Sequence, residues 1–186
     1  TRTLGPAVTL IRPLLDIRRQ EVLDYLGSLK QSFREDQSNV DVRFTRNRNR
    51  HELLPVLARD YSPGVVDALL RLSAVAGDAQ RTIEAAAARL VERAVIGSDA
   101  SRVTVDCRRL AVEDRHLVRE VFVAIWRRQG WPQQDMGFAQ WNLLADMALA
   151  PPEARVSDTR KHVFPGAITA QKQGEQLTLL ADSGHE

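Results

Sequence analysis

The sequence is poor in cysteine and has no long apolar run. Its 186 residues include one cysteine, Cys107, which excludes an intramolecular disulfide and suits a reducing compartment. No apolar stretch reaches the roughly 18 to 20 residues that a membrane-spanning helix needs. The first residues also lack the apolar core and the small-residue cleavage site of a signal peptide. We therefore expect a cytoplasmic protein that makes no contact with a membrane.

The common catalytic and cofactor-binding motifs are missing as well. The sequence contains no Gly-x-Gly-x-x-Gly, no Walker loop, no Gly-x-Ser-x-Gly and no His-Glu-x-x-His. Its four histidines lie far apart, and one cysteine does not complete a zinc site with them at any usual spacing. The sequence therefore predicts no metal site, and it assigns no catalytic residue to this chain.

Lysine is scarce, and the positive charge is unevenly distributed. Lysine and arginine total 26 against 24 aspartates and glutamates, and because three are lysines, 23 are arginines. Residues 1–60 hold 11 cations and 8 anions, a net charge of +3, whereas residues 61–120 hold 9 of each and residues 121–186 hold 6 and 7. The planar guanidinium group suits phosphate, so an anionic partner is expected at the first third of the chain.

The hydrophobic fraction of 44% is typical of a globular protein. In the first third, the pattern predicts an extended segment at 10–15, a helix at 16–29, a loop at 31–41 and a second helix at 44–59. Asp16 is placed to cap the first helix, and Pro55 should kink or split the second. We treat residues 1–60 as the first part of the chain.

The rest of the chain is predicted to be mainly helical. The expected elements are long helices at 63–96, 113–129 and 137–149, a short strand at 102–106, and two or three short strands after residue 151. We therefore expect a mainly α protein with long antiparallel helices in a domain at 61–150, followed by a small β-hairpin element at 151–186.

The helix at 63–96 carries an apolar seam with heptad spacing. The seam consists of Leu69, Leu72, Ala76, Ala79, Ile83, Ala86 and Leu90. Such spacing predicts packing against another helix, and it makes a weak homodimer possible. The tryptophans at 126, 131 and 141 are expected in the core of the helical domain, since a base-stacking platform would need exposed aromatics among basic residues.

Arginines cluster in the second predicted helix. Arg43, Arg46 and Arg50 have the spacing of one helix face, and Arg48 lies further round. Neighbouring guanidinium groups repel one another unless anions lie against them, so an RNA backbone or a nucleotide phosphate is a candidate partner. The alternative is a solvated basic helix. In either case, we expect Asp36 and Asn39 to shape the loop before the helix, and His51 to be a surface or capping residue.

The order of residues around these arginines resembles the bacterial tRNA(Ile)-lysidine synthetases. The resemblance rests on Arg-Pro-Leu-Leu, a helix, Asp-x-Ser-Asn-x-Asp-x-x-Phe-x-Arg-Asn-Arg-x-Arg-His-Glu-Leu-Leu-Pro and Tyr-Ser-Pro-Gly-Val, between Ile11 and Val66. It implies that residues 1–60 are the tail end of an α/β nucleotide-binding domain of the ATP-pyrophosphatase type, and that 61–150 is a helical tRNA-binding domain. The family's Ser-Gly-Gly-x-Asp-Ser loop, which holds ATP, does not occur in this sequence.

The resemblance implies an ATP-dependent ligase. Such enzymes adenylate the wobble cytidine of tRNA(Ile) at its C2 carbonyl, and the ε-amine of free lysine then displaces AMP to give lysidine. ATP with Mg²⁺ would act in the parent enzyme, with no cofactor bound by this chain alone, which we expect to be inactive. Arg46 and Arg50 would contact ATP phosphate or the anticodon stem-loop, Arg48 and Arg43 would add to the local field, and Asp36 and Asn39 would support them.

Two points stay open at the level of the sequence. Asn49 stands where the family usually has a branched apolar residue, and its spacing from Leu53 and Val56 predicts that it faces the core. An unpaired buried amide there would cost about 1–3 kcal/mol. The alternative to an enzyme part is a free-standing helical RNA-binding or protein-interaction module without catalysis.

Overall fold

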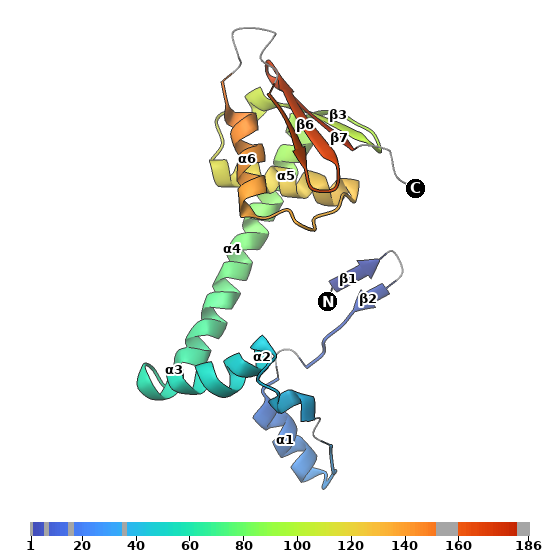
Figure 1. The fold of residues 1–186 in the computed structure, drawn as a ribbon. Helices are drawn as coiled ribbons and strands as arrows, with labels where there is room; N and C mark the ends of the chain where they lie inside the picture. Colours follow the sequence, from blue (N-terminus) through green and yellow to red (C-terminus); the bar gives the residue numbers. More distant parts are fainter. Residues whose placement is uncertain (1, 6–7, 15–16, 35–36, 152–159, 182–186) are drawn as a thin grey trace. The chain divides into compact units, whose positions relative to one another are not determined.

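The computed structural model describes residues 2–5, 8–14, 17–34, 37–151 and 160–181, and it contains two compact units (Figure 1). The first unit spans Thr1–Asp67 and the second spans Ala68–Glu186. This division differs from the three parts expected from the sequence, because the strands after residue 160 belong to the same unit as the long helices.

The first unit combines a small hairpin with short helical segments. Its elements are β1 (Arg2–Gly5), β2 (Val8–Leu10), α1 (Arg19–Ser28), the 3₁₀ helix η1 (Gln37–Val40), α2 (Thr45–Arg48), the π-helix η2 (Asn49–Leu53) and α3 (Leu54–Asp60). Helix α1 begins later than expected, at Arg19, and the expected cap Asp16 lies outside the described residues. The Glu21 carboxylate accepts a hydrogen bond from the Arg18 backbone at 2.7 Å at the start of α1.

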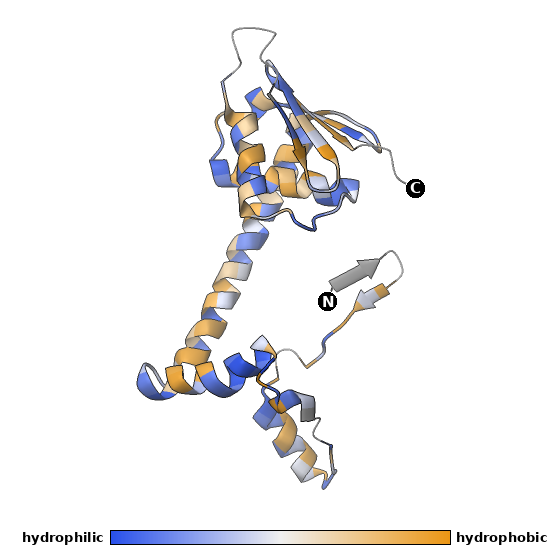
Figure 2. Cartoon of the chain, in the orientation of Figure 1, coloured by the Kyte–Doolittle hydropathy of each residue, from blue (hydrophilic) through white to orange (hydrophobic). Residues whose placement is uncertain are grey.

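No apolar side chain among residues 8–14, 17–34 and 38–67 of the first unit is fully buried. The exposed ones include Ile17, Tyr25, Leu29, Phe33, Val40, Phe44, Leu53 and Val56. Figure 2 shows orange, apolar stretches along α1. The one residue of this part that is buried is polar, Asn47, at 2% exposure. The described residues of this unit therefore form no apolar core of their own.

The second unit has a continuous apolar core. Its elements are most of α4 (Val65–Ala94), then β3 (Val95–Ser98), β4 (Arg102–Asp106), η3 (Cys107–Arg109), α5 (Arg115–Gln129), α6 (Phe138–Leu149), β5 (Arg160–Phe164), β6 (Ile168–Gln173) and β7 (Gln176–Ala181). The strands form one antiparallel sheet in the order β3-β4-β7-β6-β5. Side chains from α4, α5, α6 and the sheet share the core.

The segment at 151–186 was expected to be a separate β tail, and the structure differs from this. Strand β7 pairs with β4, from Arg102 opposite Leu180 to Asp106 opposite Gln176. The apolar residues Leu177 and Leu179 alternate with Thr178 and are fully buried. Because this alternation buries one face of the strand, β7 completes the sheet begun by β4.

The apolar seam of α4 is packed over part of its length. Leu90 at the C-terminal end is buried, and Ile83 is half-buried. Leu69 and Leu72, nearer the N-terminal end, are 47% and 64% exposed. The prediction that the seam packs is therefore confirmed for the last turns of α4, and it is wrong for Leu69 and Leu72 among the described residues.

The tryptophans occupy the core, as the sequence predicts. The ring of Trp126 is completely buried and meets Trp131 and Trp141 edge-on, with centroids 5.0 and 5.4 Å apart. Aromatic rings prefer this T-shaped geometry, because the positive edge of one ring faces the negative face of the other. Trp126 therefore does not offer a surface for stacking a base.

Candidate anion-binding site

The candidate site is built on the helical segment formed by α2, η2 and α3. The sequence predicts one helix with a break at Pro55, and the break is a wide π turn that leads into α3. The backbone N–H of Leu54 donates to the carbonyl of Asn49, five residues earlier. Pro55 has no N–H, and its ring would clash with the carbonyl of His51 in a regular α-helix. The wider turn relieves this clash and keeps the segment helical through Asp60.

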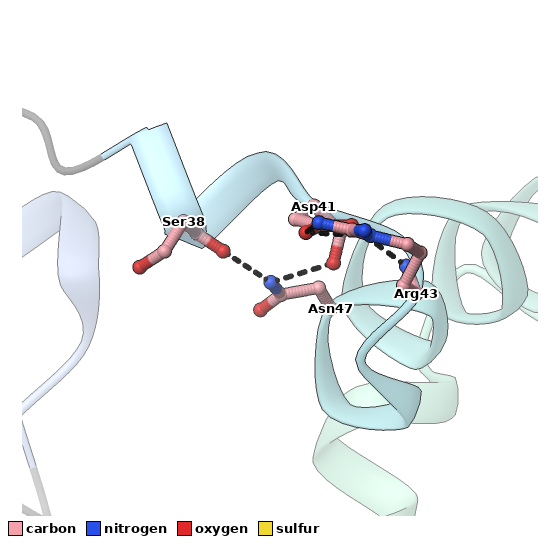
Figure 3. A network of polar contacts seen from close by, with 4 residues as sticks. All are labelled: Ser38, Asp41, Arg43 and Asn47. Carbon is pink, nitrogen blue, oxygen red and sulfur yellow. Dashed lines mark hydrogen bonds and ion pairs between the residues drawn. The ribbon is translucent and has the colours of Figure 1, made fainter.

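Two side chains of this segment contact the backbone of η1 and of the residue after it. The side-chain amide of Asn47 donates to the carbonyl oxygens of Ser38 at 2.7 Å and Asp41 at 3.0 Å (Figure 3). One turn later, Nε2 of His51 donates to the carbonyl of Asn39 at 3.0 Å. A carbonyl oxygen can only accept, so Nε2 of His51 carries the proton. These bonds join the helix to the turn that precedes it.

Arg43 does not lie on the helix face expected for it. The helix begins at Thr45, and Arg43 lies in the turn before it, where its guanidinium group folds back on the Asp41 carboxylate. Nε of Arg43 is 3.0 Å from both carboxylate oxygens, and Nη2 is 2.7 Å from Oδ2 (Figure 3). The Arg43 side chain also holds the pKa of Asp41 below its usual value. The charge of Arg43 is therefore largely compensated within the protein.

Arg46, Arg48 and Arg50 carry the uncompensated charge. All three are exposed, and none forms an ion pair with a described residue. The guanidinium carbon of Arg46 lies 6.0 Å from the centre of the Phe44 ring, a weak cation–π contact. Arg46 and Arg50 are four residues apart, so their side chains emerge one turn apart on the same side of the helix. Such a pair of cations can bind an extended anion or a polyphosphate.

The supporting residues predicted from the sequence have different outcomes. Asp36 lies outside the described residues. Asn39 contributes its backbone carbonyl, which accepts from His51, to the contact between loop and helix. His51 is exposed and lies on the helix surface, as expected.

The expectation that Asn49 faces the core is wrong, because Asn49 is exposed. The π turn begins at this residue and changes the register, so spacing from Leu53 and Val56 no longer fixes its direction. Leu53 and Val56 are themselves 48% and 38% exposed. The amide of Asn49 therefore reaches solvent, and no burial cost arises.

The residue that the sequence reasoning missed is Asn47. The motif places it between two arginines, where it looks like one more polar surface residue, yet it is buried with both of its hydrogen bonds made to backbone oxygens. A usable signal was present, because asparagine commonly bonds to nearby backbone groups and the preceding loop is rich in turn-forming residues.

Other kinds of site are not formed by the described residues. No group of three or more His, Cys, Asp or Glu side chains in this part of the chain could hold a metal ion. No described helix has both the length and the apolar character needed to span a membrane. A pocket of about 270 Å³ lies in the second unit at the end of α4, but its polar side chains pair with each other. Arg128 binds Glu92, and Gln129 binds Ser98.

Comparison with known proteins bears on the segment that carries the arginines. Residues 3–57 match the PP-loop domain family. The match contains the whole of η1, α2 and η2, including Arg46, Arg48 and Arg50. The first part of the chain is therefore similar to PP-loop domains, although the Ser-Gly-Gly-x-Asp-Ser string does not occur in it.

The chain is also similar to several tRNA(Ile)-lysidine synthases. It is 45% identical to that of Geobacter sulfurreducens over 92 residues, which are 50% of this chain and 18% of the relative. It is 28% identical to that of Rhodopirellula baltica over 212 residues, and 25% identical to that of Nostoc sp. over 187 residues. Both of these alignments include 96% of this chain, and it spans about half the length of each relative, 52% and 53%.

Proposed function

We propose that this chain is part of an ATP-dependent ligase that attaches lysine to the wobble cytidine of tRNA(Ile) to form lysidine. The observation that carries the proposal is the exposed group of Arg46, Arg48 and Arg50, of which Arg46 and Arg50 form a row on one side of the helix. The group lies within a segment that matches the PP-loop domain, in a chain similar to tRNA(Ile)-lysidine synthases. In this reaction ATP adenylates the C2 carbonyl of the cytidine, and the ε-amine of lysine then displaces AMP.

In this proposal, Arg46 and Arg50 contact the phosphate of ATP, the backbone of the tRNA(Ile) anticodon stem-loop, or both. Their exposure and their lack of ion-pair partners among the described residues support this role, since a guanidinium that is already paired has less to offer an anion. Arg48 lies further round the helix and adds to the local positive field. Arg43 contributes less, because Asp41 compensates its charge. Asp36 and Asn39 support the loop that precedes the helix.

The proposal assigns ATP, Mg²⁺ and free lysine to the complete enzyme and not to this chain alone. The absence of the Ser-Gly-Gly-x-Asp-Ser string supports it, and so does the exposure of apolar side chains such as Tyr25, Leu29 and Phe44 in the first unit. Large exposed apolar surface marks sites that pack against further protein. The helical part of the second unit would add tRNA contacts, and a homodimer could form through the exposed seam of α4.

The test uses a chimera with one of the relatives. The segment of the Geobacter sulfurreducens tRNA(Ile)-lysidine synthase that aligns with this chain is replaced by the corresponding residues of this chain. We expect the chimera to form lysidine on tRNA(Ile) in the presence of lysine and ATP, and the 186-residue chain alone to form none. A folded chimera without activity would contradict the assignment to this reaction.

The alternative, a binding module without catalysis, makes a different prediction for the same chimera. It predicts that the 186-residue chain binds the anticodon stem-loop RNA while the chimera remains inactive. Arg46→Ala in the active chimera separates the two phosphate sources. A rise in the KM for ATP assigns Arg46 to the nucleotide, and a loss of tRNA affinity with an unchanged KM for ATP assigns it to the RNA.

A further inference from the structure

The helix that carries the arginines presents two neighbouring stripes of side chains, one bonded to the preceding turn and one exposed. Asn47 and His51, one turn apart, face η1 and the residue after it, and they donate to the carbonyl oxygens of Ser38, Asn39 and Asp41. Arg46 and Arg50 each directly precede one of these residues. Since consecutive residues of an α-helix are about 100° apart around the axis, the arginine stripe lies beside the stripe that contacts η1.

We infer that Asn47 and His51 are positioning residues that clamp the helix to η1 and thereby set the direction of Arg46 and Arg50. This inference rests on the proposed function, because it assigns the clamp a role in binding phosphate. The helical segment formed by α2, η2 and α3 has no fully buried apolar side chain, so apolar packing does not fix its rotation about its own axis. The bonds from Asn47 and His51 to three backbone oxygens fix this rotation. The adjacent Arg46 and Arg50 are then held at one angle to the ligand.

Burial indicates which of the two contacts matters more. Asn47 is 2% exposed, and its amide makes both bonds away from competing water. His51 is exposed, so water can replace its bond to Asn39. We therefore assign the main positioning role to Asn47 and a secondary one to His51.

The chain offers a matched pair of substitutions for the test. Asn47→Asp keeps the size of the side chain but replaces the donating amide with an oxygen that faces two carbonyl oxygens. Asn49→Asp, two residues further on, adds the same negative charge at an exposed position without a bond to η1. Any difference between the two variants therefore reports the clamp and not the added charge.

The readout is binding of the 186-residue chain to a fluorescent tRNA(Ile) anticodon stem-loop at several salt concentrations. A substitution that only lowers the folded fraction weakens binding equally at every salt concentration, which leaves the salt slope unchanged. A substitution that turns an arginine away from phosphate removes a contact and flattens the slope by about one unit. We expect Asn47→Asp to weaken binding about tenfold and to flatten the slope, relative to Asn49→Asp.

Two results overturn the inference. One is a Kd and a slope for Asn47→Asp equal to those of Asn49→Asp, and the other is a weakened Kd with the parental slope. Arg46→Ala and Arg50→Ala are measured in parallel. If both arginine variants bind the RNA like the parent, the assignment of these arginines to the tRNA backbone fails and the inference fails with it. If they weaken binding while Asn47→Asp matches its control, the inference alone fails.

A second pair of variants covers the case in which Asn47→Asp unfolds the first unit, seen as lost amide protection in 45–60. His51→Ala removes a single exposed contact, and His51→Gln restores a side chain that can donate. We expect a flatter slope in His51→Ala and recovery toward the parental slope in His51→Gln. A parental slope in His51→Ala overturns the role of His51, and it overturns the whole inference if Asn47→Asp has unfolded.

Discussion

Lys172 offers a direct test of how the second unit is held together. Its side chain projects from β6 and is 5% exposed, and Nζ donates to the carbonyl oxygens of Ala148, at 3.0 Å, and Ala150. These oxygens are at the C-terminal end of α6, where carbonyl groups lack partners within the helix and the dipole favours a cation. The ammonium group therefore connects the sheet to the end of α6.

Lys172→Met keeps the length and the apolar part of the side chain and removes both hydrogen bonds. A bond from a charged donor contributes about 1.5–3 kcal/mol, but the substitution also removes the cost of burying the ammonium group. We expect the free energy of unfolding to fall by about 2–4 kcal/mol. For the second unit, Ala68–Glu186, that corresponds to a fall of about 8–16 °C in Tm.

The assay is thermal unfolding followed by tryptophan fluorescence, because all three tryptophans lie in the second unit. Lys161→Met is the matched control, since Lys161 is exposed on the neighbouring strand β5. We expect the control to change the Tm by less than about 2 °C. Equal melting of the two variants would refute the capping role of Lys172.

Three further predictions concern other parts of the structure. Ile83→Asp places a charge in the half-buried section of the α4 seam and should lower the free energy of unfolding by about 1–3 kcal/mol in a circular-dichroism melt. Leu72→Asp, at an exposed position, should change it by less than about 0.5 kcal/mol, and equal effects of the two variants would show that the seam does not pack as described. The hydrogen bond from the Arg43 side chain lowers the pKa of Asp41 from 3.8, so the ionised Asp41 stabilises this turn above pH 3.8 and loses that effect as the pH falls below 3.8. Amide exchange at residues 38–44 should accelerate below pH 3.8, and Asp41→Asn should remove this pH dependence. Burial raises the pKa of Cys107 to about 11, so its thiol should resist iodoacetamide at pH 8 in the folded protein and react after denaturation; rapid labelling of the folded chain would show that Cys107 is accessible.

Much of the second unit follows from its sequence. Helix α5 is marked by the Asp114 cap and by Gly130, which adopts a left-handed conformation at the C-terminal end. The alternation of Leu177, Thr178 and Leu179 is typical of a strand, and the structure forms β7 there with both leucines buried. The pairing of β7 with β4 joins residues 70 to 78 positions apart, and no local pattern specifies it.

The first unit is harder to predict, because residue spacing alone fixes neither where its arginine-rich helix begins nor which helix type it adopts. The prediction that three arginines share one helix face assumed a regular helix through 43–50. The helix begins instead at Thr45 and widens to a π turn at Asn49. Both departures change which side chains share a face, and this explains the wrong expectations for Arg43 and Asn49. Arg46 and Arg50 are both exposed, and they still emerge one turn apart because their four-residue spacing survives the change of helix type.

The central claim, that the row formed by Arg46 and Arg50 binds phosphates of the tRNA(Ile) backbone, is tested most directly by the salt dependence of RNA binding in three variants. Arg46→Ala, Arg50→Ala and Arg43→Ala each remove one positive charge, but only Arg43 is already paired with a carboxylate among the described residues. Binding of the 186-residue chain to the tRNA(Ile) anticodon stem-loop is measured across salt concentrations. If the row contacts the RNA backbone, Arg46→Ala and Arg50→Ala each flatten the slope by about one unit and Arg43→Ala changes it much less. Parental affinity and slope in both the Arg46 and Arg50 variants would contradict RNA binding by the row.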